Sequence, residues 1–457
     1  MAATLATKAT AITPAAAHRS DPRGCPANTS SQDAIEHVEK ATWRMLSYFG
    51  DPLANLDAAI ASDPAWMLPH LMKANCLLTL GEYRFSVMAR EALEQGVEQN
   101  AGRGMQPREQ AHLAATQACL EDRWQDACRL WDGILVDHPR DLAALIPAHL
   151  FDFYRGDSLN LRKRIARILP AWSPSAPLYS YVLGQYAFGL EECNLYPQAR
   201  EFGERALALE PKDPWAIHAI THVNEMQGRY KEGAAWLRER EADWAPDNAF
   251  AFHNWWHLAL FHLERLDTAT ALGLLDERIA AGSEIALQHV DVAAMLWRLR
   301  LLGVDLGDRW TRLLPNWPTQ APEAGFYCFN DLHAVLVHIG AERLDLAHRV
   351  LDAVRARAQG GGSLCATVAG DTGVPLIASL VAAAEGRHDE AVDGLLAVRD
   401  TAFRFGGSHA QRDLIEQTLL ATAIQAGRRS LARALVNERR TAKPDSPLTE
   451  WWMERIG

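Results

Sequence analysis

The chain has 457 residues, of which 48% are hydrophobic and 23% are charged, a composition typical of a soluble protein with a large apolar core. Its 46 Lys and Arg residues against 57 Asp and Glu residues give a formal net charge of −11, and no basic stripe is visible along the chain. Because nucleic acids and anionic membranes are bound by concentrated positive charge, this balance argues against both as partners.

The seven cysteines are scattered and never form a C-x-x-C pair, which predicts reduced, mostly buried thiols. The N-terminal stretch is rich in small and polar residues and has no apolar run of signal-peptide length, and no later segment approaches about 18 uncharged apolar residues. We therefore expect a cytoplasmic protein with a disordered N-terminal arm over residues 1–31 and a single helical repeat domain over residues 32–457.

From Gln32 onward, apolar residues recur at spacings of three and four, and proline and glycine mark the breaks between segments. The helices that follow four proline-containing breaks are predicted to begin near Leu142, Leu178, Trp215 and Phe250, at steps of 36, 37 and 35 residues. These steps are close to the period of about 34 residues of tetratricopeptide repeats. The sequence thus predicts an all-α fold, a right-handed superhelical solenoid of tetratricopeptide-like helical hairpins.

One segment breaks this pattern. Residues 359–375, QGGGSLCATVAGDTGVP, contain many glycines, each of which disfavours a helix by roughly 1 kcal/mol. We therefore predict a loop here, either a connector between repeats or a mobile lid, with no phosphate-binding signature.

A cluster of polar side chains stands out between Trp215 and His257. His218, His222 and Glu225 share one face of a predicted helix, and His253 and His257 are four residues apart on the next one. The first helices of adjacent repeats pack about 8 to 10 Å apart, so the imidazoles of His222, His253 and His257 are predicted to lie within about 8 Å of one another.

Two interpretations of these histidines are open. An H-x-x-x-H pair on a helix offers two imidazoles to a divalent transition metal, and Glu225 is suited to be a further ligand or a general base. The alternative is packing, because histidines on half-buried helix faces are commonly hydrogen-bonded core residues. Several buried polar groups on neighbouring helices are costly unless they satisfy one another or a ligand.

Further polar residues interrupt apolar helices later in the chain. Asn330, Asp331 and His333 form a trio within GFYCFNDLHAVLV, and Asp291 is a lone carboxylate in QHVDVAAMLWRL. They are candidates to extend the site, provided that a curved array brings them close to the histidines.

Five segments in this order are similar to the tetratricopeptide repeat protein 38 family: HAITHVNEMQGRYKEGAAWL, FHNWWHLALFHLE, VDVAAMLWRL followed by DRWTRLLP, FNDLHAVLVHIGA and FGGSHAQRD. Matching segments run from about Arg108 to Arg440. The resemblance implies a helical tetratricopeptide-like solenoid and brings no settled biochemical activity with it. The positions that match the family's motifs include His222, Glu225, His253, His257, Asp331, His333, Gln411, Arg412 and Asp413.

Two functional hypotheses follow. The first is an interaction scaffold whose concave groove binds a peptide, a partner protein or a small-molecule ligand. The second is an enzyme in which His222, His253 and His257 either bind a divalent transition metal or act directly as acid/base groups. Its candidate catalytic residues are Glu225 or Asp331 as a base, His333, and Arg412 as an anion anchor. An open channel lined by Lys, Arg or Asn favours the scaffold, and a closed pocket lined by His and Trp favours the enzyme. The sequence is also compatible with a homo-oligomer.

Overall fold

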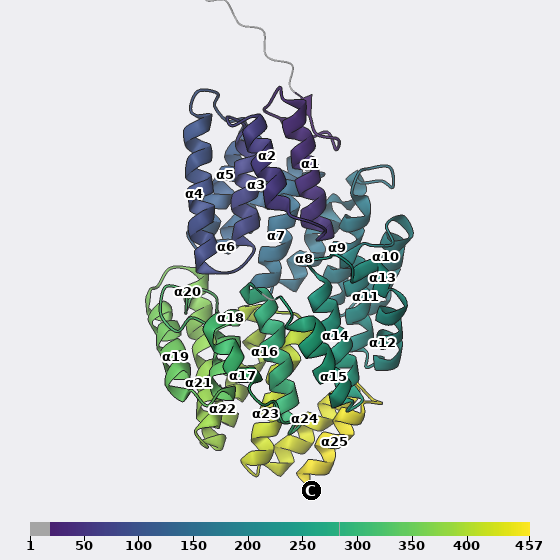
Figure 1. Cartoon of the computed structure of the whole chain (residues 1–457), viewed down its shortest axis with the longest axis vertical. Coiled ribbons are helices and arrows are strands. Elements are labelled where there is room, and N and C mark those ends of the chain that lie inside the picture. The colour runs from purple at the N-terminus through teal and green to yellow at the C-terminus, as the bar shows by residue number, and fades with distance from the viewer. Residues whose placement is uncertain (1–18, 283) are drawn as a thin grey trace, which may run out of the picture.

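Pairs of helices follow one another along the chain, and each pair packs on the next (Figure 1). The computed structural model describes residues 19–282 and 284–457. Within these residues the predicted all-α repeat solenoid is confirmed, because the regular structure is helical apart from one short β-hairpin and one isolated bridge. All seven cysteines are free thiols, as the sequence predicts.

The first half of the chain contains the short hairpin and the helices up to α13. Their bounds are β1 (Arg19–Ser20), β2 (Pro26–Ala27), α1 (Gln32–Ser47), α2 (Pro52–Ser62), α3 (Met67–Leu78), α4 (Tyr83–Asn100), α5 (Pro107–Leu120), α6 (Trp124–Asp137), α7 (Leu142–Tyr154), α8 (Ser158–Ile168), η1 (Leu169–Ala171), α9 (Tyr179–Glu191), α10 (Tyr196–Leu209), α11 (Pro214–Met226), α12 (Tyr230–Glu239) and α13 (Glu241–Trp244).

The second half continues the same arrangement. Its elements are α14 (Ala251–Glu264), α15 (Thr268–Leu274), η2 (Leu275–Ile279), α16 (Ala286–Leu301), α17 (Arg309–Leu313), η3 (Leu314–Asn316), α18 (Cys328–Gly340), α19 (Leu344–Gln359), α20 (Leu364–Val368), η4 (Ala369–Gly373), α21 (Val374–Ala384), α22 (His388–Val398), η5 (Arg399–Phe405), α23 (His409–Gln425), α24 (Arg429–Ala442) and α25 (Pro447–Ile456). The helices α7, α9, α11 and α14 each begin within one residue of the start that the proline-containing breaks predict.

The ends of α11 show why these residues form a hairpin. Asp213 caps the helix by accepting a hydrogen bond from the backbone N–H of Ala216 at 3.1 Å, and Pro214 occupies the first turn, where its missing N–H is not needed. Gly228 follows the helix at a φ of +68°, and a Cβ atom there would lie 2.9 Å from the Cα atom of Lys443. A glycine is therefore required both by the turn and by the close approach of the segment between α24 and α25.

The solenoid turns back on itself, so that C-terminal helices cover the middle of the chain. Helix α23 contacts α11 and α16, and α25 contacts α14. Trp297 of α16 donates its indole N–H to the Thr418 hydroxyl at 2.9 Å, and the Ser446 hydroxyl donates to Glu264 of α14 at 2.6 Å. The inner faces of α11, α14 and α16 are consequently buried, although they carry many polar side chains.

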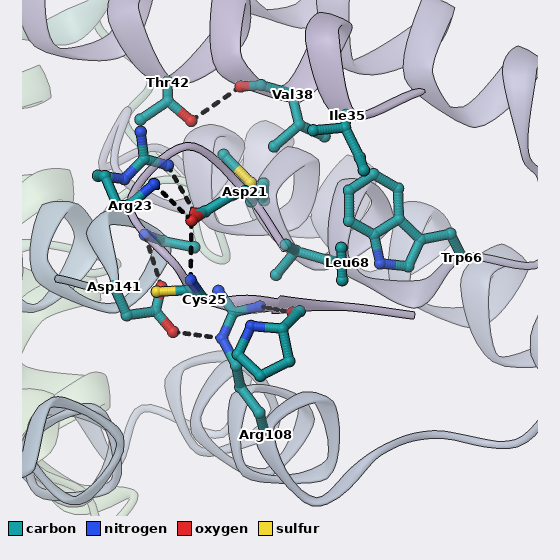
Figure 2. Close-up of a pocket in the computed structure, with 14 residues that line it drawn as sticks. Asp21, Arg23, Cys25, Ile35, Val38, Thr42, Trp66, Leu68, Arg108 and Asp141 are labelled. Atoms are coloured by element: carbon teal, nitrogen blue, oxygen red, sulfur yellow. Dashed lines mark hydrogen bonds and ion pairs between the residues drawn. The ribbon is translucent and has the colours of Figure 1, made fainter. Parts of the chain in front are cut away.

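The described part of the predicted N-terminal arm, residues 19–31, forms a short β-hairpin and packs against the helices. Figure 2 shows how it is held. Arg23 pairs with Asp21 at 2.9 Å, and Arg108 donates both to Asp141 at 2.6 Å and to the backbone carbonyl of Pro26 at 2.9 Å. The cavity between these residues measures about 10 Å³, room for about one water molecule. The expectation for residues 1–18 lies outside the described residues.

The prediction of a loop over residues 359–375 is wrong beyond the first few residues of that segment. The chain becomes helical again at Leu364, because the Ser363 hydroxyl caps the new helix by accepting from the N–H of Ala366 at 3.1 Å. Gly373 packs against Cys328, where a Cβ atom would lie 2.8 Å from the sulfur. Here glycine permits close packing and does not mark a loop.

The stretch Leu364–Ala384 is long and apolar enough to cross a membrane by length and composition, and 56% of its apolar 18-residue window is buried inside the fold. It is not an uninterrupted run of uncharged apolar residues, because Asp371 lies within it. Its contacts with α18 and α19 account for its apolar character.

Candidate metal centre

Four imidazoles from two neighbouring inner helices meet inside the solenoid. One ligand nitrogen from each lies within 4.8 Å of those of the other three. The Nε2 atom of His218 is 2.9 Å from that of His222 and 3.2 Å from that of His257. The sequence prediction that His222, His253 and His257 approach within about 8 Å is confirmed. We call this group the histidine cluster: His218, His222, His253 and His257.

The hairpin geometry places these four side chains together. Two of them lie four residues apart on α11 and two lie four residues apart on α14, so each pair occupies one helix face. Helix α12 packs against α11 and α14 on the outer side, and a Cβ atom on its Gly233 would lie only 2.2 Å from the ring of Phe261 of α14. The absence of a side chain at this position therefore lets α14 approach closely enough for the two pairs to meet.

Carboxylates from three helices lie behind the imidazoles. The Nδ1 atom of His253 is 2.6 Å from Asp291 of α16, and that of His257 is 3.2 Å from Glu225 of α11. The Nδ1 atom of His222 is 3.3 Å from Glu191 of α9, close to it but not aligned as a hydrogen bond.

A carboxylate at Nδ1 fixes the orientation of an imidazole and leaves Nε2 to bind a metal ion, an arrangement typical of metal sites. Among the described residues, the Nδ1 atom of His218 has no hydrogen-bond partner. Two of the four imidazoles are therefore held by acids, a third lies beside one, and one nitrogen from each ring lies within 4.8 Å of those of the others.

The cluster is almost completely removed from solvent. His222 and His257 are 0% exposed, His218 is 5% exposed and His253 is 8% exposed. Burial lowers the pKa of His222 to about 4, and burial together with the neighbouring imidazoles lowers the pKa of His218 and His257 well below the usual value. These three rings are neutral at pH 7, which is the form that binds a metal ion.

The acids around the cluster are themselves perturbed. Burial, with a smaller contribution from Glu192, raises the pKa of Glu191 well above its usual value. Burial also raises the pKa of Glu225, although Lys443 opposes this effect. The neutral imidazoles give these buried carboxyl groups no positive charge, and a cation bound by the imidazoles would favour their ionised form.

A buried charge network continues from Glu225 toward the C-terminus. The Nζ atom of Lys443 lies 3.7 Å from Glu225 and 3.2 Å from Glu264. Arg439 of α24 pairs with Glu264 and, at 2.7 Å, with Asp413 of α23. The position of Glu225 thus depends on helices from the opposite end of the chain.

Asp331 and His333 do not join the histidine cluster. One carboxylate oxygen of Asp331 accepts from the N–H of Gly325 at 2.9 Å, and its other oxygen has no partner among the described residues. The Nδ1 atom of His333 lies 2.7 Å from the carbonyl oxygen of Phe329. Burial raises the pKa of Asp331 to about 7 and lowers that of His333 to about 4.

Arg412 lies on a different wall of the interior. It donates to the carbonyl of Gly407, and its Nη2 atom is 3.2 Å from His409 Nδ1 and 3.5 Å from Glu192. It lines a cavity of about 660 Å³ together with Arg155, Arg162 and Arg404, and none of the four cluster histidines lies in this wall. Glu192, which Arg412 approaches, also lies near the cluster, because ligand atoms of Glu191, Glu192 and His222 lie within 4.8 Å of one another.

Three contributors were incompletely identified from the sequence. His218 was placed on the correct face but not among the predicted ligands, and Asp291 was noted only as an isolated carboxylate. Glu191 was not identified. The sequence feature that indicates Glu191 is the pair Glu191–Glu192 at the C-terminal end of a buried apolar helix. Two acids are unusual there, because the helix dipole disfavours negative charge at that end.

No family model matches this chain. Among solved structures, it is similar to the one described as the crystal structure of the APC/C hetero-tetramer Cut9-Hcn1. The match covers 93% of this chain and 76% of that chain, with 11% sequence identity and a TM-score of 0.42.

Proposed function

We propose that this protein is a tetratricopeptide-like repeat protein of the tetratricopeptide repeat protein 38 family, and that its histidine cluster binds one divalent transition-metal ion. The observation that supports the proposal is the convergence of four imidazole nitrogens within 4.8 Å, with carboxylates at the Nδ1 atoms of three of the rings. Metal–nitrogen bonds of about 2.0–2.1 Å in a tetrahedron separate the nitrogens by about 3.4 Å. The Nε2 atom of His218 lies 2.9 Å from that of His222 and 3.2 Å from that of His257, near that value.

The donor set restricts the class of ion. Neutral imidazoles suit Zn²⁺, Cu²⁺, Fe²⁺, Ni²⁺ and Co²⁺, whereas Mg²⁺ and Ca²⁺ prefer oxygen ligands. No cysteine belongs to the cluster, so it offers no thiolate to a softer ion. A divalent ion also offsets the negative charge of the surrounding acids, Glu191, Glu225 and Asp291.

We further propose that the ion links α11 to α14. Four protein ligands complete a tetrahedron, and closed sites of this kind stabilise a fold, whereas catalytic zinc sites keep one position open. The competing catalytic role is supported by the histidine-only ligand set and by the slight exposure of His253 at 8%. A bound ion with an open position would supply Lewis-acid chemistry, with Glu225, 3.2 Å from the Nδ1 atom of His257, as the candidate acid/base group.

Cobalt substitution tests both parts of this proposal. We expect Co²⁺ added to the metal-free protein to give the intense visible absorption of a tetrahedral site, saturating at one equivalent and absent from the His253→Ala, His257→Ala double variant. The exposed His348→Ala variant is the matched control. A spectrum that azide or cyanide does not shift supports the closed, structural site. A shift on adding azide supports an open, catalytic one, and no cobalt spectrum at all contradicts the metal site.

A second proposal concerns ligand binding in the concave groove, the role expected from the repeat fold. The cavity of about 660 Å³ is large enough for a small molecule or a short peptide segment. Its wall carries Arg155, Arg162, Arg404 and Arg412, and Arg162 forms no ion pair within the described part of the chain. We propose that this cavity binds an acidic ligand or an acidic segment of a partner protein.

An acidic peptide should then bind the wild-type protein and bind Arg162→Ala more weakly, and equal affinity would contradict the proposal.

A further inference from the structure

A second cavity, of about 390 Å³, lies where the turn before α4 meets α16 and α18. Its volume is in the range of pockets that hold small organic molecules. None of the cluster histidines lies in its wall, and the metal proposal does not involve it. Four aromatic side chains line it: Tyr83, Trp317, Phe326 and Tyr327.

The wall is strongly acidic. It contains the carboxylates of Glu82, Glu284, Glu323 and Asp331. Its only lysine or arginine is Arg84, which is already engaged with Glu82 at 2.8 Å and with the backbone carbonyl of Glu284 at 3.0 Å. The carboxylates of Glu284 and Glu323 are exposed and form no ion pair within the described residues. An unbalanced negative charge therefore faces the cavity.

Asp331 is the buried member of this set. It is 4% exposed, and one of its carboxylate oxygens has no hydrogen-bond partner in the described part of the chain. An unsatisfied buried carboxylate is unfavourable unless a ligand or a proton compensates it. Its place in the cavity wall makes it a natural counter-ion for a ligand bound there.

The aromatic rings indicate which kind of cation the cavity is suited to bind. A cation lying over an aromatic face is attracted by the ring quadrupole, and such cages are used to bind organic ammonium groups. A metal ion needs several ligand atoms close together. No three of these wall carboxylates have oxygens within 4.8 Å of one another in the described residues, so they are spread too widely to enclose a metal ion. A larger cation with an apolar surface fits both the acids and the rings.

We propose that this cavity binds an organic ammonium ion, with Asp331 and Glu323 as counter-ions and the aromatic side chains around its alkyl groups. The same group occurs on a free amine and on a lysine side chain of a partner protein. Binding here is independent of the metal centre, so failure of either proposal leaves the other standing.

Isothermal titration calorimetry at constant ionic strength tests the proposal, with tetramethylammonium, butylammonium and Nα-acetyl-lysine methylamide as probes. We expect at least one probe to bind, and Asp331→Asn and Glu323→Gln each to weaken it by about tenfold. Glu454→Gln removes an exposed carboxylate outside the cavity and should bind as the wild type does. Preference for the capped lysine over butylammonium indicates a protein side chain as the source, and the reverse preference indicates a free amine.

Glu323 is exposed, so Glu323→Gln should fold normally and keeps the test valid if Asp331→Asn is unstable. Thermal melting of each variant checks this. The proposal is overturned if no probe binds the wild-type protein, or if a probe binds it and both cavity variants with equal affinity.

Discussion

The Nδ1 atom of His253 lies 2.6 Å from Asp291, which connects the second histidine helix, α14, to the next inner helix, α16. The contact fixes which imidazole nitrogen remains for a metal ion. It also shows how the solenoid forms the site: one helix supplies the ligand and its neighbour supplies the acid that orients it.

Replacing Asp291 with Asn should weaken metal binding without abolishing it. The amide keeps the shape of the side chain but loses the charge that orients His253 and makes its ring more basic, and such changes typically lower metal affinity about 10- to 100-fold. Competition with a chromophoric chelator measures the change. Asp352→Asn, on an exposed carboxylate that pairs with Arg355, is the control. Equal affinities of Asp291→Asn and the wild type would show that Asp291 is not part of the metal centre.

Replacing Glu264 with Gln should destabilise the fold. Glu264 faces Arg439 and Lys443, and without its charge these buried cations retain too little compensation, which typically costs about 3–5 kcal/mol. Urea denaturation measures the loss. Glu204→Gln, at a surface carboxylate 3.9 Å from Arg200, should change stability little.

The same residue gives the fold a pH dependence. Burial alone would raise the pKa of Glu264, but Arg439 and Lys443 outweigh it, so the folded pKa lies below the unfolded value. Its stabilising contribution is therefore present above the unfolded pKa and is lost as the pH falls through the folded one. If Glu264→Gln were as stable as the wild type at neutral pH, the network would not stabilise the chain.

Asp213→Asn should stabilise the protein at high pH. Burial raises the pKa of Asp213 to about 7, so the folded state holds this proton more tightly than the unfolded state. Stability then falls as the pH rises from the unfolded pKa of about 4 to about 7, by up to about 4 kcal/mol. Asparagine can still cap α11 and carries no charge. Melting temperatures should agree near pH 4, diverge between about pH 4 and about pH 7, and stay apart above it, with the variant higher, and divergence in the opposite sense would contradict this account.

Binding of tetramethylammonium should strengthen as the pH rises through about 7. Burial raises the pKa of Asp331 to about 7, and only the ionised carboxyl attracts a cation. Arg357 opposes this shift, and the other charged or titratable groups around it are Glu82, Arg84, Glu284, His289, Glu323, Tyr327 and Cys328. Calorimetric titrations at about pH 6 and about pH 8 measure the change. Asp331→Asn should lose this pH dependence, and an unchanged dependence in the variant would assign it to another group.

The sequence predicts much of the fold because local rules govern it. Each hairpin is determined by its own capping residues, small residues and terminal prolines, as in α11, so the proline-containing breaks predict four helix starts to within one residue. Residues 359–375 show where local rules fail. Gly373 is required by its packing contact with Cys328 of another hairpin, and helix propensity carries no information about such a contact.

The site was predicted in part for the same reason. His218, His222, His253 and His257 are related by spacing within a helix and by stacking of adjacent hairpins, both of which can be predicted from the repeat. Glu191 approaches through the register of α9 against α11, and Lys443 approaches through the return of the solenoid. Asp331, like the histidines, is a polar residue in an apolar helix. It lines a different cavity because of how distant helices pack together, which the sequence pattern does not show.

The central claim is most directly tested by the metal content of protein purified without chelator and then incubated with Zn²⁺, Co²⁺, Ni²⁺ or Fe²⁺, measured by mass spectrometry of the elements. The account predicts one ion per chain in the wild type and in His348→Ala, and none in the His253→Ala, His257→Ala variant. A wild-type protein that retains none of these ions, or a double variant that retains as much as the wild type, would contradict it.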